Sequence, residues 1–417
     1  MSDTRVQARR AIEALRSGVP NRDAVQALGS SQPEIEHHFA SQLDSVATGG
    51  PTSGLLVRGG FGSGKSHLLE YLQHVAHTRR FVTSKIVVSK ETPLHDLVKV
   101  FRTAAATATV PDRRGPALAA LANDALDFES PAFAELARWV ATDEAALNDR
   151  FEAMLYLFRD LRGGDPEFAE RVVRFWSGEP MGVAELRRKL REAGASAAFA
   201  LPKVSARELS LQRFRFASQL MVAAGYSGWI LLFDEVELVG RYSLLQRARS
   251  YAEIARWVSG FDDEPLPRVG SVLAVTRDFE PAVIDDKNDF DNVPNRLRAN
   301  GDDLGAARAE AGMRAITRAR IDLAPPSESV LEESYGKLKE IHGIAYDWHA
   351  PELMRERGRL THSMREYVRA WINEWDLRRL DPAYMPDIEV VQVQTDYAED
   401  QELQTASESA SDEESDR

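Results

Sequence analysis

The 417-residue sequence contains no cysteine, so it can form neither a disulfide nor a cysteine metal site, and a reducing compartment is expected. It also has no apolar run approaching 18 residues, and we therefore expect no membrane-spanning helix. No apolar run follows the early basic residues Arg5, Arg9 and Arg10, so no signal peptide is predicted. These absences together predict a cytoplasmic protein that does not associate with membranes.

Basic residues are fewer than acidic residues: the sequence has 52 Lys and Arg against 65 Asp and Glu, which gives a formal net charge of −13. Residues 398–417 hold eight acidic side chains and one basic side chain, which accounts for −7 of that charge. The remaining chain is only mildly acidic. This balance argues against attraction of nucleic acid to the whole surface but leaves a local basic face open, so direct contact with DNA stays undecided.

Hydrophobic residues make up 43% of the chain, enough for a sizeable core and for two or three domains. An apolar run at 54–59, a helical pattern at 65–77 and a strand pattern at 81–89 form one βαβ unit, which implies a parallel sheet. Further strands are predicted at 229–235, 269–276 and 320–323. The predicted fold class is α/β, with the parallel sheet of an AAA+-like P-loop NTPase.

The predicted division of the chain has four parts. They are a helical segment at 1–50, an ATPase core at 51–325 with a helical insertion at about 93–224, a small helical lid-like domain at 326–380, and an extended, acidic, disordered tail at 381–417.

The segment from Gly59 to Ser66 fits the pattern G-x-x-x-x-G-K-[ST] without a mismatch. Glycines allow successive N–H groups to point into one hollow, and the following helix adds its positive end, so the segment is suited to phosphate. Lys65 is predicted to reach the β- and γ-phosphates of ATP, and the Ser66 hydroxyl to bind Mg²⁺. A chance match in a glycine-rich turn is the alternative, but the flanking strand and helix favour the site. The predicted nucleotide contacts are Gly59, Gly60, Phe61, Gly62, Ser63, Gly64, Lys65, Ser66 and His67.

An acidic pair, Asp234 and Glu235, follows four consecutive apolar residues at 230–233. Ligands gather at the carboxyl ends of buried parallel strands, so Asp234 is predicted to hold Mg²⁺ with Ser66. Glu235 is predicted to polarise the attacking water. The alternative is a strand that ends in solvated acids. Glu237 is a third acid nearby, and the pattern leaves open whether it faces the site or solvent.

Two weaker candidates complete the predicted site. Thr276 ends the strand at 269–276, where a polar residue can sense the γ-phosphate, although a strand-ending Thr can equally be a cap. Arg365 lies on a late helix at 361–375 and could act as an arginine clamp on the phosphates, or be a surface arginine. Arginines that might complete a neighbouring subunit's site cannot be chosen from the sequence; the candidates are Arg241, Arg247, Arg249, Arg296 and Arg298.

Four segments resemble the ATP-binding P-loop proteins of BREX-type bacteriophage-defence systems. They are residues 10–20, 56–67, 231–237 and 364–369, the last resembling the small helical domain of AAA+ ATPases. The resemblance covers roughly residues 8–381. It implies an AAA+-like ATPase that acts with a helicase-type partner on DNA in defence. Carried onto this sequence, it implies site residues Lys65, Ser66, Asp234 and Glu235, with Thr276 and Arg365 less directly marked.

The leading hypothesis is therefore a Mg²⁺-dependent, ATP-hydrolysing protein, which could assemble into a homo-oligomer. A second hypothesis is a nucleotide-gated scaffold that binds partners and hydrolyses little ATP. A third, a small-molecule kinase, lacks an evident acceptor-binding lid after the glycine loop, and the acidic pair favours attack by water.

Overall fold

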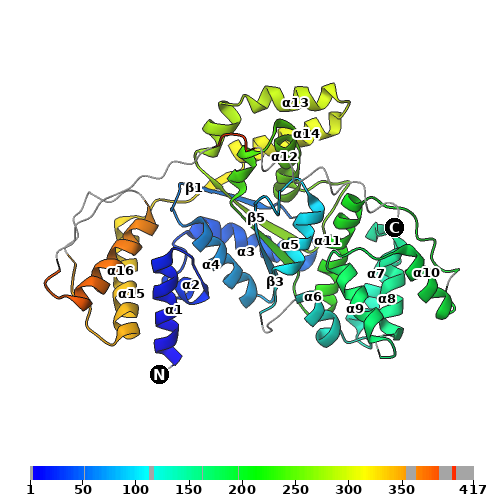
Figure 1. The fold of residues 1–417 in the computed structure, drawn as a ribbon, viewed down its shortest axis with the longest axis horizontal. Coiled ribbons are helices and arrows are strands. Elements are labelled where there is room, and N and C mark those ends of the chain that lie inside the picture. The colour runs from blue at the N-terminus through cyan, green and yellow to red at the C-terminus, as the bar shows by residue number, and fades with distance from the viewer. Residues whose placement is uncertain are drawn as a thin grey trace.

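The computed structural model describes residues 3–50, 52–111, 117–161, 163–195, 197–353, 363–384 and 397–400. A six-stranded sheet with the order β3-β2-β4-β5-β1-β6 lies at its centre (Figure 1). All neighbouring strands run parallel except β2 and β3. The strands are β1 (Leu55–Gly59), β2 (Val82–Val87), β3 (Ala108–Thr109), β4 (Trp229–Asp234), β5 (Val269–Thr276) and β6 (Arg320–Asp322). The predicted α/β class and the predicted strands are confirmed, and the short β3 is an addition within a region expected to be helical.

Side chains alternate between the two faces of the sheet, and both faces are covered. Val57 and Leu232 point into one hydrophobic cluster, whereas Leu56 and Phe233, their neighbours in the sequence, point into another. A strand with period-two alternation and two buried faces needs apolar residues throughout. This requirement explains the continuous apolar runs.

One face is covered by α3 (Pro33–Thr48) and α4 (Lys65–Thr78). Helix α3 starts with a proline in its first turn and ends at Gly49 in the left-handed conformation, which are the usual signals for a helix start and stop. Helix α4 begins directly after the glycine loop, so the loop lies at its positive end.

The opposite face is covered by helices from several parts of the chain. They are α5 (Leu97–Ala106), α11 (Ala206–Ala223), α12 (Leu244–Ser259), α13 (Asp289–Ala299) and α14 (Asp303–Arg318), with the short helices η3 (Val236–Arg241) and η4 (Glu280–Asp285). Asp96 caps α5 by accepting hydrogen bonds from the N–H groups of Val98 and Lys99. Helices α5 and α11, the first and last helices within the predicted insertion, therefore belong to the layer that covers the sheet.

The rest of the predicted insertion is helical, and Figure 1 shows it to one side of the sheet. Its elements are α6 (Ala117–Ala120), η1 (Leu121–Ala125), α7 (Pro131–Val140), η2 (Asp143–Ala145), α8 (Asp149–Leu161), α9 (Pro166–Trp176) and α10 (Val183–Glu192). The Trp176 ring lies 5.1 Å from that of Phe216 on α11, centroid to centroid. The insertion is thus packed onto the sheet layer through aromatic contacts.

The first and last helices of the described chain pack together on the other side (Figure 1). They are α1 (Asp3–Ser17), α2 (Arg22–Leu28), α15 (Glu328–Tyr346) and α16 (Met364–Leu380). Ile12, Leu338 and Ile372 share one buried cluster, and Arg16 forms an ion pair with Asp376 at 2.5 Å. Segments that the sequence analysis placed in separate units therefore share a core, while the proposed domain boundaries themselves stay a prediction.

Four residues of the predicted tail, 397–400, lie against η3, α12 and the end of β5. The predictions for 385–396 and 401–417 fall outside the described residues. Within the described ranges, no helix combines the length and the apolarity needed to cross a bilayer.

Candidate functional site

The glycine loop, residues 59–66, joins β1 to α4 at the carboxyl edge of the sheet. Gly64 has φ +104°, a conformation that favours glycine, and a Cβ added at Gly59 would collide with the Ser63 hydroxyl. Lys65 is 9% exposed, and its ammonium donates hydrogen bonds to the carbonyls of Gly59 and Gly60, each at 3.3 Å. The loop therefore curls around the amino group of its own lysine.

The predicted acids lie at the end of β4, two strands away from β1. Asp234 is buried, and one of its carboxylate oxygens accepts a hydrogen bond from the Glu235 N–H at 3.0 Å. Glu235 is exposed and has φ +58°, a left-handed conformation that is costly for a residue with a side chain. Desolvation and the Asp234 carboxylate raise the pKa of Glu235, whereas Lys65 and Arg365 oppose the shift. An exposed carboxylate with a raised pKa is suited to accept a proton from water.

Glu237, which the sequence analysis left undecided, faces the site rather than solvent. It is 4% exposed, and its Oε1 lies 3.9 Å from the Lys65 ammonium. Its Oε2 is buried without a hydrogen-bond partner among the described residues. Burial raises the pKa of Glu237 to about 7, although Lys65 pulls it down. No pattern in the sequence distinguished Glu237 from a solvated acid.

Thr276 ends β5, the strand that lies between β1 and β4, and its Cα is paired in register with that of Gly59. Its hydroxyl is 2.7 Å from the hydroxyl of Tyr397, and the threonine is 1% exposed. The fold thus brings Thr276 between the glycine loop and the acidic pair. Tyr397 is a neighbour that the sequence analysis missed, because nothing in a polar tail marks a residue that docks elsewhere.

Arg365 is the second residue of α16, and the fold brings it to the glycine loop. The backbone N–H of Arg365 donates to the Gly62 carbonyl at 3.3 Å, and the Ser363 hydroxyl donates to the same carbonyl at 3.0 Å. The Arg365 guanidinium lies 5.5 Å from the centre of the Phe61 ring and contributes to the electrostatic environment of Glu235. The late helix is therefore attached to the loop, and its arginine acts on Glu235 by lowering the pKa of that carboxyl group.

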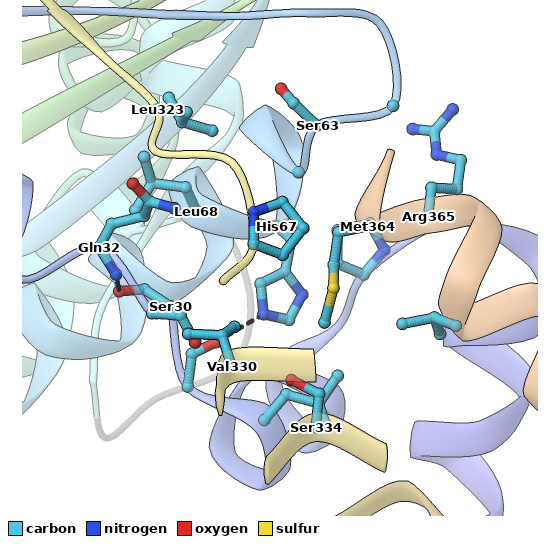
Figure 2. Close-up of a pocket in the computed structure, with 18 of the residues that line it drawn as sticks. Ser30, Gln32, Ser63, His67, Leu68, Leu323, Val330, Ser334, Met364 and Arg365 are labelled. Atoms are coloured by element: carbon cyan, nitrogen blue, oxygen red, sulfur yellow. Dashed lines mark hydrogen bonds between the residues drawn. The ribbon is translucent and has the colours of Figure 1, made fainter. Parts of the chain in front are cut away.

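A cavity of about 260 Å³ opens beside the glycine loop (Figure 2). Its apolar wall comes from the helices α1, α2, α15 and α16 and from the segment after β6; the residues are Ala14, Leu15, Leu28, Leu323, Val330, Met364 and Val368. His67 lies in this wall, and its Nε2 is 2.8 Å from the Gly29 carbonyl oxygen. Burial lowers the pKa of His67, so the ring is neutral at pH 7. A small apolar cavity with a few polar groups, next to a loop suited to phosphate binding, can hold the planar base of a nucleotide.

Three of the arginines considered for a neighbouring subunit's site are engaged within this chain. Arg241 pairs with Asp400 at 2.8 Å. Arg247 is 3% exposed and pairs with Asp289 at 2.9 Å and with Glu399 at 2.8 Å. Arg298 pairs with Glu310 at 2.5 Å. Each of the three is thus held by a carboxylate of its own chain.

Comparison with protein families shows the class of this chain. Residues 4–370 match the family described as "BREX system ATP-binding protein BrxC/D". The match covers most of the sequence, so the chain belongs to this family of ATP-binding proteins of BREX systems. Comparison with curated proteins and comparison with solved structures gave no match.

Proposed function

We propose that this chain is an AAA+-like P-loop NTPase that binds ATP with Mg²⁺ and hydrolyses it within a bacteriophage-defence complex. The proposal is carried by one observation, the convergence of Lys65, Asp234 and Thr276 at the carboxyl edge of the sheet. Asp234 ends β4, Thr276 ends β5, and the glycine loop that leads to Lys65 follows β1; the three strands are adjacent in the order β4-β5-β1. Family membership supports the ATP-binding part, and the remaining roles follow from the residues.

ATP is proposed to lie with its phosphates in the glycine loop and its base in the cavity beside His67. The N–H groups of residues 60–66 and the positive end of α4 would bind phosphate oxygens. Lys65 would exchange the carbonyls of Gly59 and Gly60 for the β- and γ-phosphates. Arg365 would add positive charge to the γ-phosphate from α16.

The residues present fit a magnesium ion. The buried carboxylate of Asp234 and the hydroxyl of Ser66 are oxygen donors, and Mg²⁺ needs few protein ligands when it also binds phosphates and water. When bound, Mg²⁺ would neutralise charge that develops on the phosphates.

Hydrolysis would begin when Glu235 accepts a proton from a water molecule. The water oxygen forms a bond to the γ-phosphorus while the bond to the bridging oxygen of the β-phosphate breaks, which yields ADP and phosphate. Thr276 would hydrogen-bond the γ-phosphate or the attacking water. The raised pKa of Glu235 is favourable for this role, because a general base works best when its pKa lies closer to the pH at which the enzyme operates.

The deciding measurement is phosphate release from ATP by the wild type and by Glu235→Gln, with and without DNA. We expect Glu235→Gln to retain ATP binding and to lose turnover by about 100-fold or more. Lys65→Ala should lose ATP binding itself. Unchanged turnover in Glu235→Gln would remove Glu235 from the mechanism, and stimulation by DNA would support a DNA-coupled role.

A nucleotide-gated scaffold is the second candidate, favoured by the attachment of α16 to the glycine loop at Gly62. Nucleotide binding at that loop would alter the position of α16 without any need for hydrolysis. Tight ATP binding with no turnover, either alone or with DNA, would favour this function. Rapid turnover by the purified chain that Lys65→Ala abolishes would argue against it.

Partners and location follow from the family and stay proposals. Membership in a multi-component defence system suggests protein partners, and we propose a helicase-type component acting on DNA in the cytoplasm. Whether the chain forms a homo-oligomer can be measured by its mass in solution with and without ATP.

A further inference from the structure

A short segment near the end of the chain, residues 397–400, is docked in a formed socket beside the candidate site (Figure 1, dark red). We call this segment the strap. Tyr397 is 8% exposed, and its ring meets that of Phe279 edge-on with 6.3 Å between centroids. A Cβ at Gly240 would lie 3.0 Å from the Tyr397 ring, so the socket accommodates the ring because residue 240 is glycine.

Three cations, from η3, from α12 and from the turn between η4 and α13, hold the polar part of the strap. The Lys287 ammonium donates to the carbonyls of Tyr397 and Gly240, each at 2.9 Å. Arg247, itself almost fully buried, pairs with Glu399 at 2.8 Å, and Arg241 pairs with Asp400 at 2.8 Å. The Asp400 N–H also donates to the Arg241 carbonyl at 3.0 Å. The socket is thus complementary to an aromatic residue followed by acidic residues.

The first residue of the strap contacts Thr276, the residue proposed to sense the γ-phosphate. The Tyr397 hydroxyl lies 2.7 Å from the Thr276 hydroxyl, at hydrogen-bond distance. Each hydroxyl carries one proton, so either of the two can be the donor. In both arrangements the Tyr397 hydroxyl occupies a hydrogen-bonding position on Thr276, and a γ-phosphate oxygen has to compete with it for that residue.

We propose that the surface formed by Gly240, Arg241, Arg247 and Lys287 is a binding site for an acidic peptide with a leading tyrosine. The chain's own residues 397–400 occupy this site, where they restrain ATP turnover by engaging Thr276. This inference rests on the proposed ATPase function. Because coupling between two sites is reciprocal, the strap and the γ-phosphate oppose each other's binding, whereas ADP, which lacks that phosphate, does not.

The experiment uses the full-length chain with two strap variants and one control. Tyr397→Phe keeps the ring and removes the hydroxyl. Glu399→Gln combined with Asp400→Asn removes the two acidic groups that pair with arginines. Glu402→Gln combined with Glu408→Gln removes the same charge from the part of the tail outside the described residues. The measurements are binding of a non-hydrolysable ATP analogue and of ADP, phosphate release, and amide hydrogen exchange of residues 397–400.

We expect Tyr397→Phe to bind the ATP analogue about two- to tenfold more tightly than wild type, with ADP affinity unchanged. Phosphate release should rise by a similar factor. The double strap variant should show the same changes together with faster exchange of 397–400, and the control should match wild type. In the wild type, the ATP analogue should accelerate exchange of the strap and ADP should not.

Several results would overturn the proposal. Unchanged analogue affinity and turnover in both strap variants, with a protected strap in wild type, would make the contact purely structural. Slower turnover in Tyr397→Phe would mean that the Tyr397 hydroxyl helps Thr276 to act in hydrolysis instead of keeping it from the γ-phosphate. Exchange protection that disappears on dilution would show that the socket binds another copy's strap. If wild type binds no nucleotide, the proposed function fails first, and this inference fails with it.

Discussion

The ammonium of Lys65 lies 3.9 Å from the carboxylate of Glu237, and both side chains are buried. The lysine that is proposed to bind phosphate thus has an acidic neighbour. The contact joins the glycine loop to the segment after β4, so loading of the loop with nucleotide has to compete with it. Burial also raises the pKa of Glu237 to about 7, so its protonation changes close to neutral pH.

The free energy of unfolding should therefore depend on Glu237 in a defined pH window. Its folded-state pKa is about 7, raised by burial from 4.5, so the folded state binds the proton more tightly than the unfolded state. Stability is then lost as pH rises from about 4.5 to 7, by on the order of 2–3 kcal/mol, and levels off above that. Glu237→Gln should remove this loss and be more stable than wild type at pH 8.

Denaturant unfolding at pH 5 and pH 8 checks this prediction. Glu144→Gln, which changes an exposed glutamate in the same way, is the control and should follow wild type at both values. Equal pH dependence in wild type and Glu237→Gln would show that Glu237 stays charged in the folded chain.

Two neighbouring glycines of the loop should respond differently to alanine. Gly59→Ala would drive its methyl group into the Ser63 hydroxyl, whereas a methyl group at Gly60 would meet open space. We expect Gly59→Ala to cost about 1–3 kcal/mol of stability and to weaken ATP binding about tenfold or more. Thermal unfolding and nucleotide binding measure both effects, and Gly60→Ala is the control for stability, since it should unfold like wild type. An equal loss of stability in the two variants would contradict the loop geometry.

Filling the cavity beside the loop should block the nucleotide base while sparing the fold. Val330 on α15 lines the cavity, so Val330→Trp is expected to lower ATP affinity about tenfold or more, with little change in melting temperature. Ile344→Trp, on an exposed position of the same helix, serves as the control. Unimpaired ATP binding by Val330→Trp would place the base elsewhere.

Arg365 and Arg369 lie one turn apart on α16, but only Arg365 contacts the glycine loop. Arg365→Ala should reduce phosphate release about 10- to 100-fold, because it removes a charged hydrogen-bond donor from the γ-phosphate. Steady-state kinetics with kcat and KM separated measure this, and Arg369→Ala, which removes an exposed arginine, should behave as wild type. A loss of the same size in both variants would point to a role of α16 as a whole.

The residues that carry their own local signal could be predicted from the sequence. The run 230–233 with Asp234 and Glu235, and the loop from Gly59 to Ser66, depend on short-range chemistry: apolar residues that demand burial, and glycines that permit one turn. The strand β5 was predicted with the bounds that the structure has, 269–276. Family membership, also suggested by these segments, is confirmed.

Residues whose role depends on distant neighbours could not be predicted. The burial of Glu237 depends on how η3 turns back toward Lys65, and a single acid after a strand carries no mark of that turn. The cavity wall joins α1 to α15 and α16, which are more than 300 residues apart in the chain. Pairing across such separations is decided by packing of whole helices.

By itself, the sequence determined the strands β1, β2, β4, β5 and β6, the α/β class and the glycine loop with its acidic partner strand, because these follow from hydrophobic period and from backbone freedom. Only the tertiary structure decided that β5 lies between β1 and β4, that α16 attaches to Gly62, and that Tyr397 reaches Thr276. These contacts form because burying apolar surface and pairing polar groups are properties of the whole chain, and no local pattern records which distant partner meets each residue.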